Sequence, residues 1–188
     1  MLICTHCFTQ YIPTHLNAGF VERFDESQCV HVNFGSSCPK CGHEIVDVDE
    51  EIIPHLVLLW EKGYKTLFSC AGHVYCNIHP DKYVKQYQCE IDTYIIIDTT
   101  NLDDNIVKGI LEKPYNYKYA VINERPLLDR NNHKVTHLII HASHAIYSDV
   151  DEYYTNDVTK PKYACYELLC DIRKEVFCIV EELPDLNE

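Results

Sequence analysis

Four cysteines in the first part of the chain have the residue type and the spacing of a zinc site. Cys4 and Cys7 form one C-x-x-C motif, and Cys38 and Cys41 form a second. Zinc favours four ligands at tetrahedral angles, and a tight C-x-x-C turn presents two thiolates from one short segment. The sequence therefore predicts a zinc ribbon in which these four cysteines bind one zinc ion. Because four protein ligands fill the coordination shell, this zinc is expected to be structural rather than catalytic.

The residues around the two motifs add one supporting detail and two alternatives. Gly42 follows the second motif, at the position where such a turn favours a left-handed backbone, and Phe8 stands at the same position after the first. The cysteines could instead be four unrelated buried residues, because free cysteine behaves as a small hydrophobe. Other residues near the motifs could also replace one ligand: His6, Cys29, His31 and His43.

A second group with chemical potential is the segment 69–73, with the sequence S-C-A-G-H. It follows the run 64–69, which has the composition of a strand. We expect the segment to be a loop at the end of that strand, where a rigid element commonly aims functional side chains outward. Its candidate ligand-binding residues are Ser69, Cys70, Gly72 and His73.

Three interpretations of this segment remain open. Cys70 and His73 could bind a second metal together with Cys76 and His79, because C-x-x-H-x-x-C-x-x-H offers soft and borderline ligands at regular spacing. Cys70 could be a nucleophile with His73 as its base, which requires a lowered thiol pKa. The loop could also be architectural, with Gly72 at positive φ, Cys70 buried and His73 bonded to the backbone.

The stretch from Leu59 to His73 resembles a family of small uncharacterised zinc-ribbon proteins from low-GC bacteria and phages. Members begin with paired C-x-x-C motifs and then carry G-Y-x-T-x-F-S-C-x-G-H, which residues 63–73 match here. The resemblance implies the ribbon architecture and points to Ser69 to His73, but the family has no established activity. A fainter similarity is to the S-C-x-G-R loop of the wybutosine-synthesis methyltransferase family, which acts on transfer RNA; this sequence has His73 in place of the arginine.

Further histidines, cysteines and tyrosines have weaker patterns. His137 and His141 fall on one face of an expected strand and His144 on the other, so hydrogen bonding explains them better than a shared metal. Three cysteines of the last helix lack ligand spacing and suit core packing: Cys165, Cys170 and Cys178. Alternate tyrosines suit either a recognition face or the outer face of an edge strand: Tyr115, Tyr117 and Tyr119.

Composition and charge restrict the classes of function. With 46% hydrophobic and 24% charged residues the chain is expected to be globular. Its net charge of −13 repels phosphate backbones, which disfavours nucleic acid as a partner. The longest apolar run, 52–60, is too short for a membrane span. The chain has eleven cysteines, an odd number, and no signal peptide is expected before Cys4. Both observations favour metal binding over disulfide bonds and predict a cytoplasmic protein.

Hydrophobic periodicity predicts the order of the elements. Segments 20–24 and 30–34 alternate as a hairpin within the ribbon. A helix over 52–60, capped by Asp47 or Asp49, should end at Gly63. The remaining expected elements are strands 64–69 and 94–97, a helix from Asn101 to Pro114, strands 119–123 and 136–141, and a long amphipathic helix over 165–180.

Paired strands between helices predict an α+β fold, with a mixed or antiparallel sheet and helices on one face. We expect a zinc ribbon over residues 1–46 and an α+β domain over residues 47–188. The leading functional hypothesis is a binding or regulatory protein, of which an accessory role in a bacterium or phage is one form, with a protein partner or a small ligand. The alternative is a nucleotide- or RNA-modifying enzyme with its site at Ser69 to His73 and a second metal.

Overall fold

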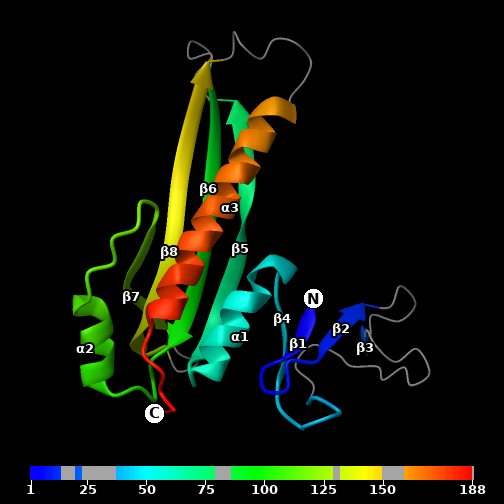
Figure 1. The fold of residues 1–188 in the computed structure, drawn as a ribbon, viewed down its shortest axis with the longest axis vertical. Helices are drawn as coiled ribbons and strands as arrows, with labels where there is room; N and C mark the ends of the chain where they lie inside the picture. The colour runs from blue at the N-terminus through cyan, green and yellow to red at the C-terminus, as the bar shows by residue number, and fades with distance from the viewer. Residues whose placement is uncertain (14–19, 23–36, 79–85, 129–131, 150–158, 188) are drawn as a thin grey trace.

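The chain forms a small sheet beside a larger, elongated sheet, each antiparallel (Figure 1). The predicted α+β class is confirmed, and the larger sheet is antiparallel rather than mixed. The computed structural model describes residues 1–13, 20–22, 37–78, 86–128, 132–149 and 159–187.

The small sheet carries the predicted ribbon and has its own buried cluster. Its strand order is β3-β2-β1-β4, and β1 lies between β2 and β4. Leu2, Tyr11 and Ile45 are fully buried and pack around the cysteine motifs. The expected hairpin differs in part, because segment 20–22 pairs with β2, while 30–34 lies outside the described residues. The four strands are β1 (Leu2–Cys4), β2 (Gln10–Pro13), β3 (Phe20–Glu22) and β4 (Ile45–Asp47).

The link from the ribbon to the larger sheet is a short 3-10 turn followed by a helix, η1 (Glu50–Ile52) and α1 (Ile53–Glu61). Asp49, one of the two predicted caps, occupies the N-cap position of the 3-10 turn, whereas the N-cap of α1 itself is Ile52, and the side chain of Asp49 makes no capping hydrogen bond. Its carboxylate instead accepts a hydrogen bond from the backbone N–H of Ala71 in the next strand. Gly63 follows the helix with φ +88°. Many helices end at a residue with positive φ, and glycine adopts this conformation most easily.

The larger sheet has the strand order β5-β6-β8-β7 and confirms the predicted sequence of two strands, a helix and two strands. Its strands are longer than hydrophobic periodicity indicated. The short helix α2 is capped by Asp103, whose carboxylate accepts a hydrogen bond from Asn105, and not by Asn101 as predicted. The elements are β5 (Lys65–Ile78), β6 (Gln86–Asp98), α2 (Asp104–Glu112), β7 (Ala120–Leu128) and β8 (Lys134–Asp149).

The last helix, α3 (Thr159–Glu182), lies along one face of the larger sheet (Figure 1). Its predicted apolar face is confirmed, and it packs on the side chains of β6 and β8 that point toward it. Lys62 Nζ fixes the end of this helix by donating hydrogen bonds to the carbonyls of Val180, Glu181 and Leu183 at 3.2, 2.6 and 2.6 Å. The buried residues of the helix are Cys165, Leu169, Ile172, Val176, Ile179 and Val180.

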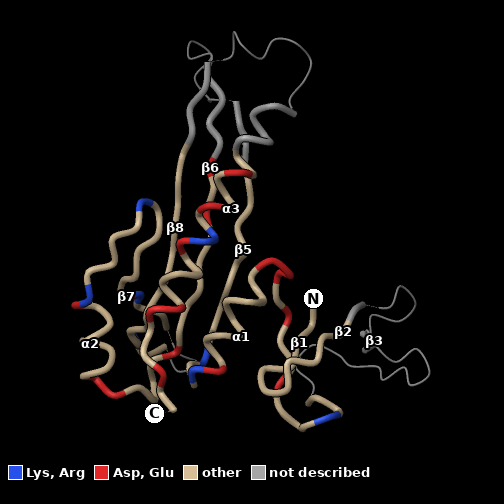
Figure 2. The backbone as a smooth tube through the Cα atoms, in the orientation of Figure 1, with Lys and Arg blue, Asp and Glu red and all other residues tan. Residues whose placement is uncertain are grey.

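Acidic positions lie along α3 and around the start of α1, whereas the described parts of the long strands carry few charges (Figure 2). None of the helices in the described part of the chain is long and apolar enough to cross a membrane.

Candidate metal centre

The first cysteine motif lies in the turn that leaves β1. The backbone N–H groups of His6 and Cys7 each point at Cys4 Sγ, at 3.5 Å. Phe8 closes the turn with φ +56°, and its N–H donates to the carbonyl of Cys4 at 3.2 Å. A bulky residue in this left-handed conformation is uncommon, so the turn holds Phe8 where glycine would be easier.

The second motif is a turn of the same kind between residue 37 and β4. Gly42 has φ +77°, and its N–H donates to the carbonyl of Cys38 at 2.8 Å. The N–H of Cys38 donates to the carbonyl of His43 at 2.7 Å, which closes the turn. Both motifs thus adopt the local geometry that turns two sulfur atoms toward one point.

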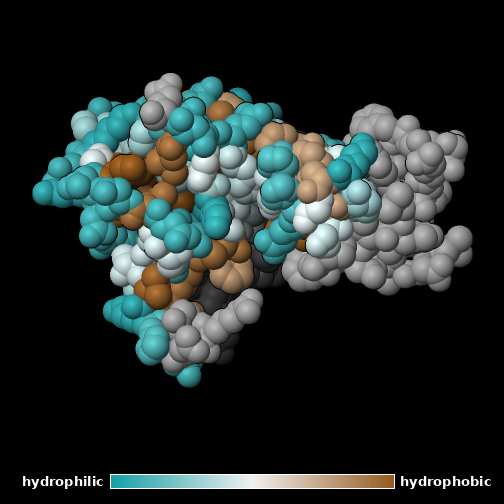
Figure 3. Space-filling view, turned by 90° about the horizontal axis from the view of Figure 1, so that it is seen from below, coloured by the Kyte–Doolittle hydropathy of each residue, from teal (hydrophilic) through white to brown (hydrophobic). Residues whose placement is uncertain are grey.

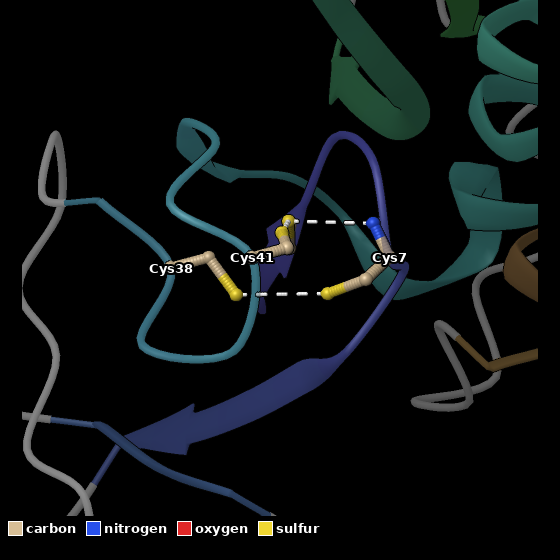
Figure 4. A group of neighbouring side chains, drawn as sticks. Cys7, Cys38 and Cys41 are labelled. Carbon is tan, nitrogen blue, oxygen red and sulfur yellow. Dashed lines mark hydrogen bonds between the residues drawn. The ribbon is translucent and has the colours of Figure 1, made fainter.

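The structure brings the two motifs together, although 30 residues separate them in the sequence. Cys4 Sγ lies 3.4 Å from Cys41 Sγ, and Cys7 Sγ lies 3.6 Å from Cys38 Sγ. Figure 4 shows Cys7 reaching in from one turn and Cys38 and Cys41 from the other. All four sulfur atoms lie within 4.8 Å of one another. A tetrahedral zinc–thiolate shell, with bonds of about 2.3 Å, separates its sulfur atoms by about 3.8 Å, so the cage fits zinc.

Burial and hydrogen bonds set the electrostatics of the cage. Burial raises the pKa of Cys4 to about 12. Burial also acts against ionisation of Cys7, but its hydrogen bonds with Thr9, and then with Cys4 and Cys41, outweigh burial and lower the pKa of Cys7 to about 6. In Cys38, burial is likewise outweighed, here by the hydroxyl of Tyr11 at 3.3 Å, and the pKa is lowered. A divalent cation would stabilise all four groups as thiolates, which is the form that binds zinc.

Neither of the two nearby histidines that the structure describes replaces a cysteine ligand. The rings of His6 and His43 stack on each other at the surface, with centroids 3.9 Å apart. His43 Nδ1 lies 3.1 Å from the carbonyl oxygen of Cys41. Cys29 and His31 lie outside the described residues. The cluster of Cys4, Cys7, Cys38 and Cys41 can therefore hold a metal ion such as zinc in a closed, structural shell.

The prediction that segment 69–73 forms a loop at a strand end is wrong. The segment lies inside β5, and its register with β6 shifts between Cys70 and His73. Cys70 pairs with Tyr94 and His73 pairs with Asp92, so three steps along β5 match two along β6. This is a β-bulge, which inserts one extra residue into a continuing strand.

Gly72 is required at the bulge for two reasons. Its φ is +93°, and a Cβ placed on it would lie 2.6 Å from the carbonyl oxygen of Asp92 and 2.7 Å from a methyl group of Leu169. Arg173 of α3 holds the bulge by donating from Nε to the carbonyl of Ala71 at 2.6 Å. The architectural interpretation is thus confirmed for Gly72, but Cys70 is half-buried rather than buried. His73 is exposed, and its bond to the backbone stays a prediction.

The three histidines of β8 have separate surroundings, and the structure does not bring them together. His137 is buried, with Nδ1 3.6 Å from Asp98. His141 Nε2 lies 3.2 Å from the amide nitrogen of Asn123, and the ring of His144 meets Tyr119 edge-on. Core packing is confirmed for Cys165, which is 1% exposed, while Cys170 is exposed and Cys178 half-buried on the same helix.

The alternate tyrosines before β7 were expected to form either a recognition face or the outer face of an edge strand, and neither expectation describes Tyr115 and Tyr117. Tyr115 and Tyr117 precede β7, which begins at Ala120, so they lie on no edge strand. Both are half-buried and pack against the core of the larger sheet, and the hydroxyl of Tyr117 donates to Glu182. They therefore fix the segment before β7 to the end of α3 and do not form an open recognition face.

Sequence reasoning missed two residues that position the bulge, Asp49 and Arg173. Asp49 was expected only as a helix cap, and Arg173 falls on a long helix among several other charges. No local pattern indicates that either contacts segment 69–73, because the contacts cross 22 and about 100 residues of chain.

Comparison with known proteins adds no family to this description. No protein-family model, curated protein or solved structure matches the chain. The resemblance to the zinc-ribbon family of low-GC bacteria and phages stays a prediction, of which the four-cysteine cluster is the part that the structure supports.

Proposed function

We propose that this chain is a small-molecule-binding protein whose ligand lies on the open face of the larger sheet and whose ribbon zinc is structural. The observation that carries this proposal is a hollow of about 490 Å³ that spans all four strands. Its volume falls within the range of about 300–1,000 Å³ that small-molecule sites occupy. It is lined by Phe68, Asp92, Tyr94, Ile96, Asn123, Glu124, Arg125, Leu127, Ile139 and His141.

Strand register sorts the floor of the hollow into an apolar row and a polar row. Phe68 pairs with Ile96, and Ile96 pairs with Ile139, which gives three apolar side chains side by side across β5, β6 and β8. In the next row Tyr94 pairs with His141. Register partners in antiparallel strands point to the same face, so an apolar floor lies beside hydrogen-bonding groups.

The polar groups of the hollow favour a ligand that is neutral or carries hydrogen-bonding groups of both kinds. The amide of Asn123 and the ring of His141 lie 3.2 Å apart and form one polar edge. Asp92, Glu124 and Arg125 place both signs of charge at the rim. A planar molecule could stack its apolar part on the floor and direct polar atoms to Tyr94 and this edge.

Exposed apolar residues support a binding role for this part of the molecule. Phe68 is 61% exposed and Val121 is 41% exposed, and both point away from the core that α3 covers. Viewed from below, apolar surface also gathers in patches among hydrophilic residues (Figure 3). Of the two exposed residues, Phe68 lines the hollow, so its exposed ring is available to a ligand there.

The neutral planar dye Nile red tests the proposal on the full chain. We expect its fluorescence to rise on binding and to saturate at about one dye per chain, the stoichiometry of a single pocket. Phe68→Ser and Ile139→Ser should weaken binding about tenfold or more, because each removes part of the apolar floor. Neutral aromatic fragments could then be screened for their ability to displace Nile red, which would define the natural ligand class.

Leu128→Ser is the matched control, because Leu128 is 68% exposed on the same sheet but does not line the hollow. This variant should bind the dye as the parent does. Equal loss in all three variants, or no saturable binding by the parent chain, would contradict the proposal.

A nucleotide- or RNA-modifying enzyme acting at Ser69, Cys70, Gly72 and His73 is the second candidate. The bulge favours it, because Cys70 and His73 pair with Tyr94 and Asp92, both of which line the hollow. Cys70 is poorly suited to be a nucleophile, since burial first, and then Asp49 and Asp92, raise its pKa. The enzyme would therefore act through His73 or a bound metal. Incubation with nucleosides and mass spectrometry of the products tests it, and His73→Ala should abolish any turnover without changing dye binding.

A further inference from the structure

The β-bulge in β5 places Cys70 and His73 on the same face of the sheet. In a regular strand, residues three positions apart point to opposite faces. The extra residue at the bulge changes this alternation, because Cys70 and His73 pair with Tyr94 and Asp92, which are two positions apart on β6. The backbone therefore presents a thiol and an imidazole on the same face of the sheet.

Asp49 adds a carboxylate to this pair from outside the sheet. One oxygen of Asp49, Sγ of Cys70 and one ring nitrogen of His73 all lie within 4.8 Å of one another. The carboxylate is held in place, because its Oδ2 accepts a hydrogen bond from the N–H of Ala71 at 2.9 Å. An oriented carboxylate of this kind is common among metal ligands, whose second contacts fix their direction.

The backbone around Cys70 resembles the turn around Cys4. In the bulge, the N–H of Gly72 points at Cys70 Sγ at 3.4 Å, and in the ribbon the N–H of His6 points at Cys4 Sγ at 3.5 Å. In both places the donor lies two residues after the sulfur. Such N–H groups favour the thiolate form of cysteine, which is the form that binds a metal.

We propose that Asp49, Cys70 and His73 bind a second zinc ion, with the fourth coordination position open to water or to a ligand. One sulfur, one nitrogen and one oxygen ligand suit zinc among the common divalent metals. Three protein ligands with one open position are typical of reactive zinc sites, in contrast to the closed shell of the ribbon. Because Asp92 and Tyr94 line the hollow, this ion would lie at its edge.

The charges around the three ligands suit a cation. The carboxylate of Asp49 lies beside the thiol of Cys70, and Asp92 is the strand partner of His73, so two negative charges lie close to the three ligands. Arg173 partly offsets them, and its guanidinium is directed at the carbonyl groups of Ala71 and Gly72. A divalent ion would neutralise the carboxylate and stabilise the thiolate at once.

The zinc content of the purified full chain tests this proposal after dialysis against buffered zinc. We expect about two zinc ions per chain in the parent and about one in His73→Ala, because the two protein ligands that remain in the second site cannot bind zinc tightly. His73 is exposed, so its removal should leave the fold intact. Asp49→Asn and Cys70→Ser should also lose one ion, and Asp49→Asn keeps an acceptor for the N–H of Ala71.

Cys170→Ser is the matched control, since Cys170 is an exposed thiol on α3 and belongs to neither candidate metal cluster. It should retain the zinc content of the parent. Cobalt substitution supplies an independent readout, because the thiolate-to-cobalt absorption of the second site should disappear in Cys70→Ser while that of the four-cysteine site remains. A parent chain with one zinc, or a zinc content that His73→Ala and Cys70→Ser leave unchanged, would overturn the proposal. Nile red binding by His73→Ala stays at the parent level in either case, so the small-molecule proposal is tested separately.

Discussion

The two sheets of this protein solve the problem of stability in different ways. The ribbon has a small buried cluster in which Cys4 and Cys38 lie beside Leu2, Tyr11 and Ile45. The larger sheet buries a continuous apolar core between its strands and three helices, with isoleucine at many of its positions. A short chain segment cannot bury enough apolar surface to offset its loss of conformational entropy, so we expect the fold of the ribbon, but not that of the larger sheet, to depend on a bound metal.

The largest expected effect is the loss of the ribbon metal. Cys38→Ser, or a strong chelator, should unfold the ribbon, because metal binding contributes on the order of 10 kcal/mol to the folding of such sites. The larger sheet should remain folded. Hydrogen exchange followed by mass spectrometry should show lost protection in residues 1–13 and retained protection in β6 and β8.

Cys170→Ser serves as the control for thiol removal, because Cys170 is exposed and distant from the ribbon cluster in sequence. It should retain protection in both sheets. Simultaneous loss of protection in the two sheets of Cys38→Ser would show that they unfold as one unit, and the comparison between them would fail.

A large cavity in the core should have the opposite pattern, because it should destabilise the larger sheet and leave the ribbon folded. Ile172 is fully buried under the sheet, and Ile172→Ala should lower the free energy of unfolding of the larger sheet by about 2–5 kcal/mol. Urea denaturation followed by circular dichroism measures this change. Zinc binding by the ribbon should persist in the variant, and Tyr166→Ala on the exposed side of α3 should change stability by about 0.5 kcal/mol or less.

The bulge gives a smaller and more local effect. Gly72→Ala should destabilise the larger sheet by about 1–3 kcal/mol, because the new Cβ meets the carbonyl of Asp92 at 2.6 Å and φ is +93°. Gly109→Ala in α2 is the matched control, since nothing lies within 4 Å of a Cβ there. It should stabilise the protein by up to about 1 kcal/mol. Equal effects in thermal denaturation would mean that the bulge places no constraint on residue 72.

The smallest effect concerns acid sensitivity of the larger region. Burial lowers the pKa of His55, whose Nε2 lies 3.0 Å from the carbonyl of Arg173, and the nearby Arg173 charge also acts to lower it. The unfolded chain, with a histidine pKa of about 6.5, therefore binds the proton more tightly than the folded one. The stability that neutral His55 contributes to the fold is therefore fully present at pH values above this unfolded-state pKa. It decreases as the pH falls below that pKa.

Urea denaturation at a series of pH values checks this expectation. The parent should lose stability between pH values of about 7 and 5, and His55→Leu should have a shallower pH dependence over the same interval. A parallel dependence in the two proteins would assign the acid sensitivity to groups other than His55.

Several elements could be predicted because the information is local. The spacing of Cys165, Leu169, Ile172 and Val176 on one helical face predicted α3, and the structure buries that face. The order of strands and helices in the larger sheet followed from the same periodicities. Helix caps were less certain, because Asp103 rather than Asn101 accepts the capping hydrogen bond of α2.

The bulge shows why one prediction was wrong. Small residues and a glycine indicate a turn in a sequence, and S-C-A-G-H at residues 69–73 has that composition. A glycine inside a strand can equally mark a bulge, and pairing with β6 distinguishes the two cases. Pairing depends on residues about 20 positions away, which no local pattern at Gly72 reports.

The amino-acid sequence was sufficient to predict the four cysteines that cluster in the ribbon and the type and order of the main elements, because each depends on spacing within a few residues. The assembled chain was needed to place Asp49 beside Cys70 and His73, and to form a hollow across four strands. Those arrangements arise from strand pairing and packing between distant segments, whose geometry is fixed only when the backbone hydrogen bonds and the core are satisfied together.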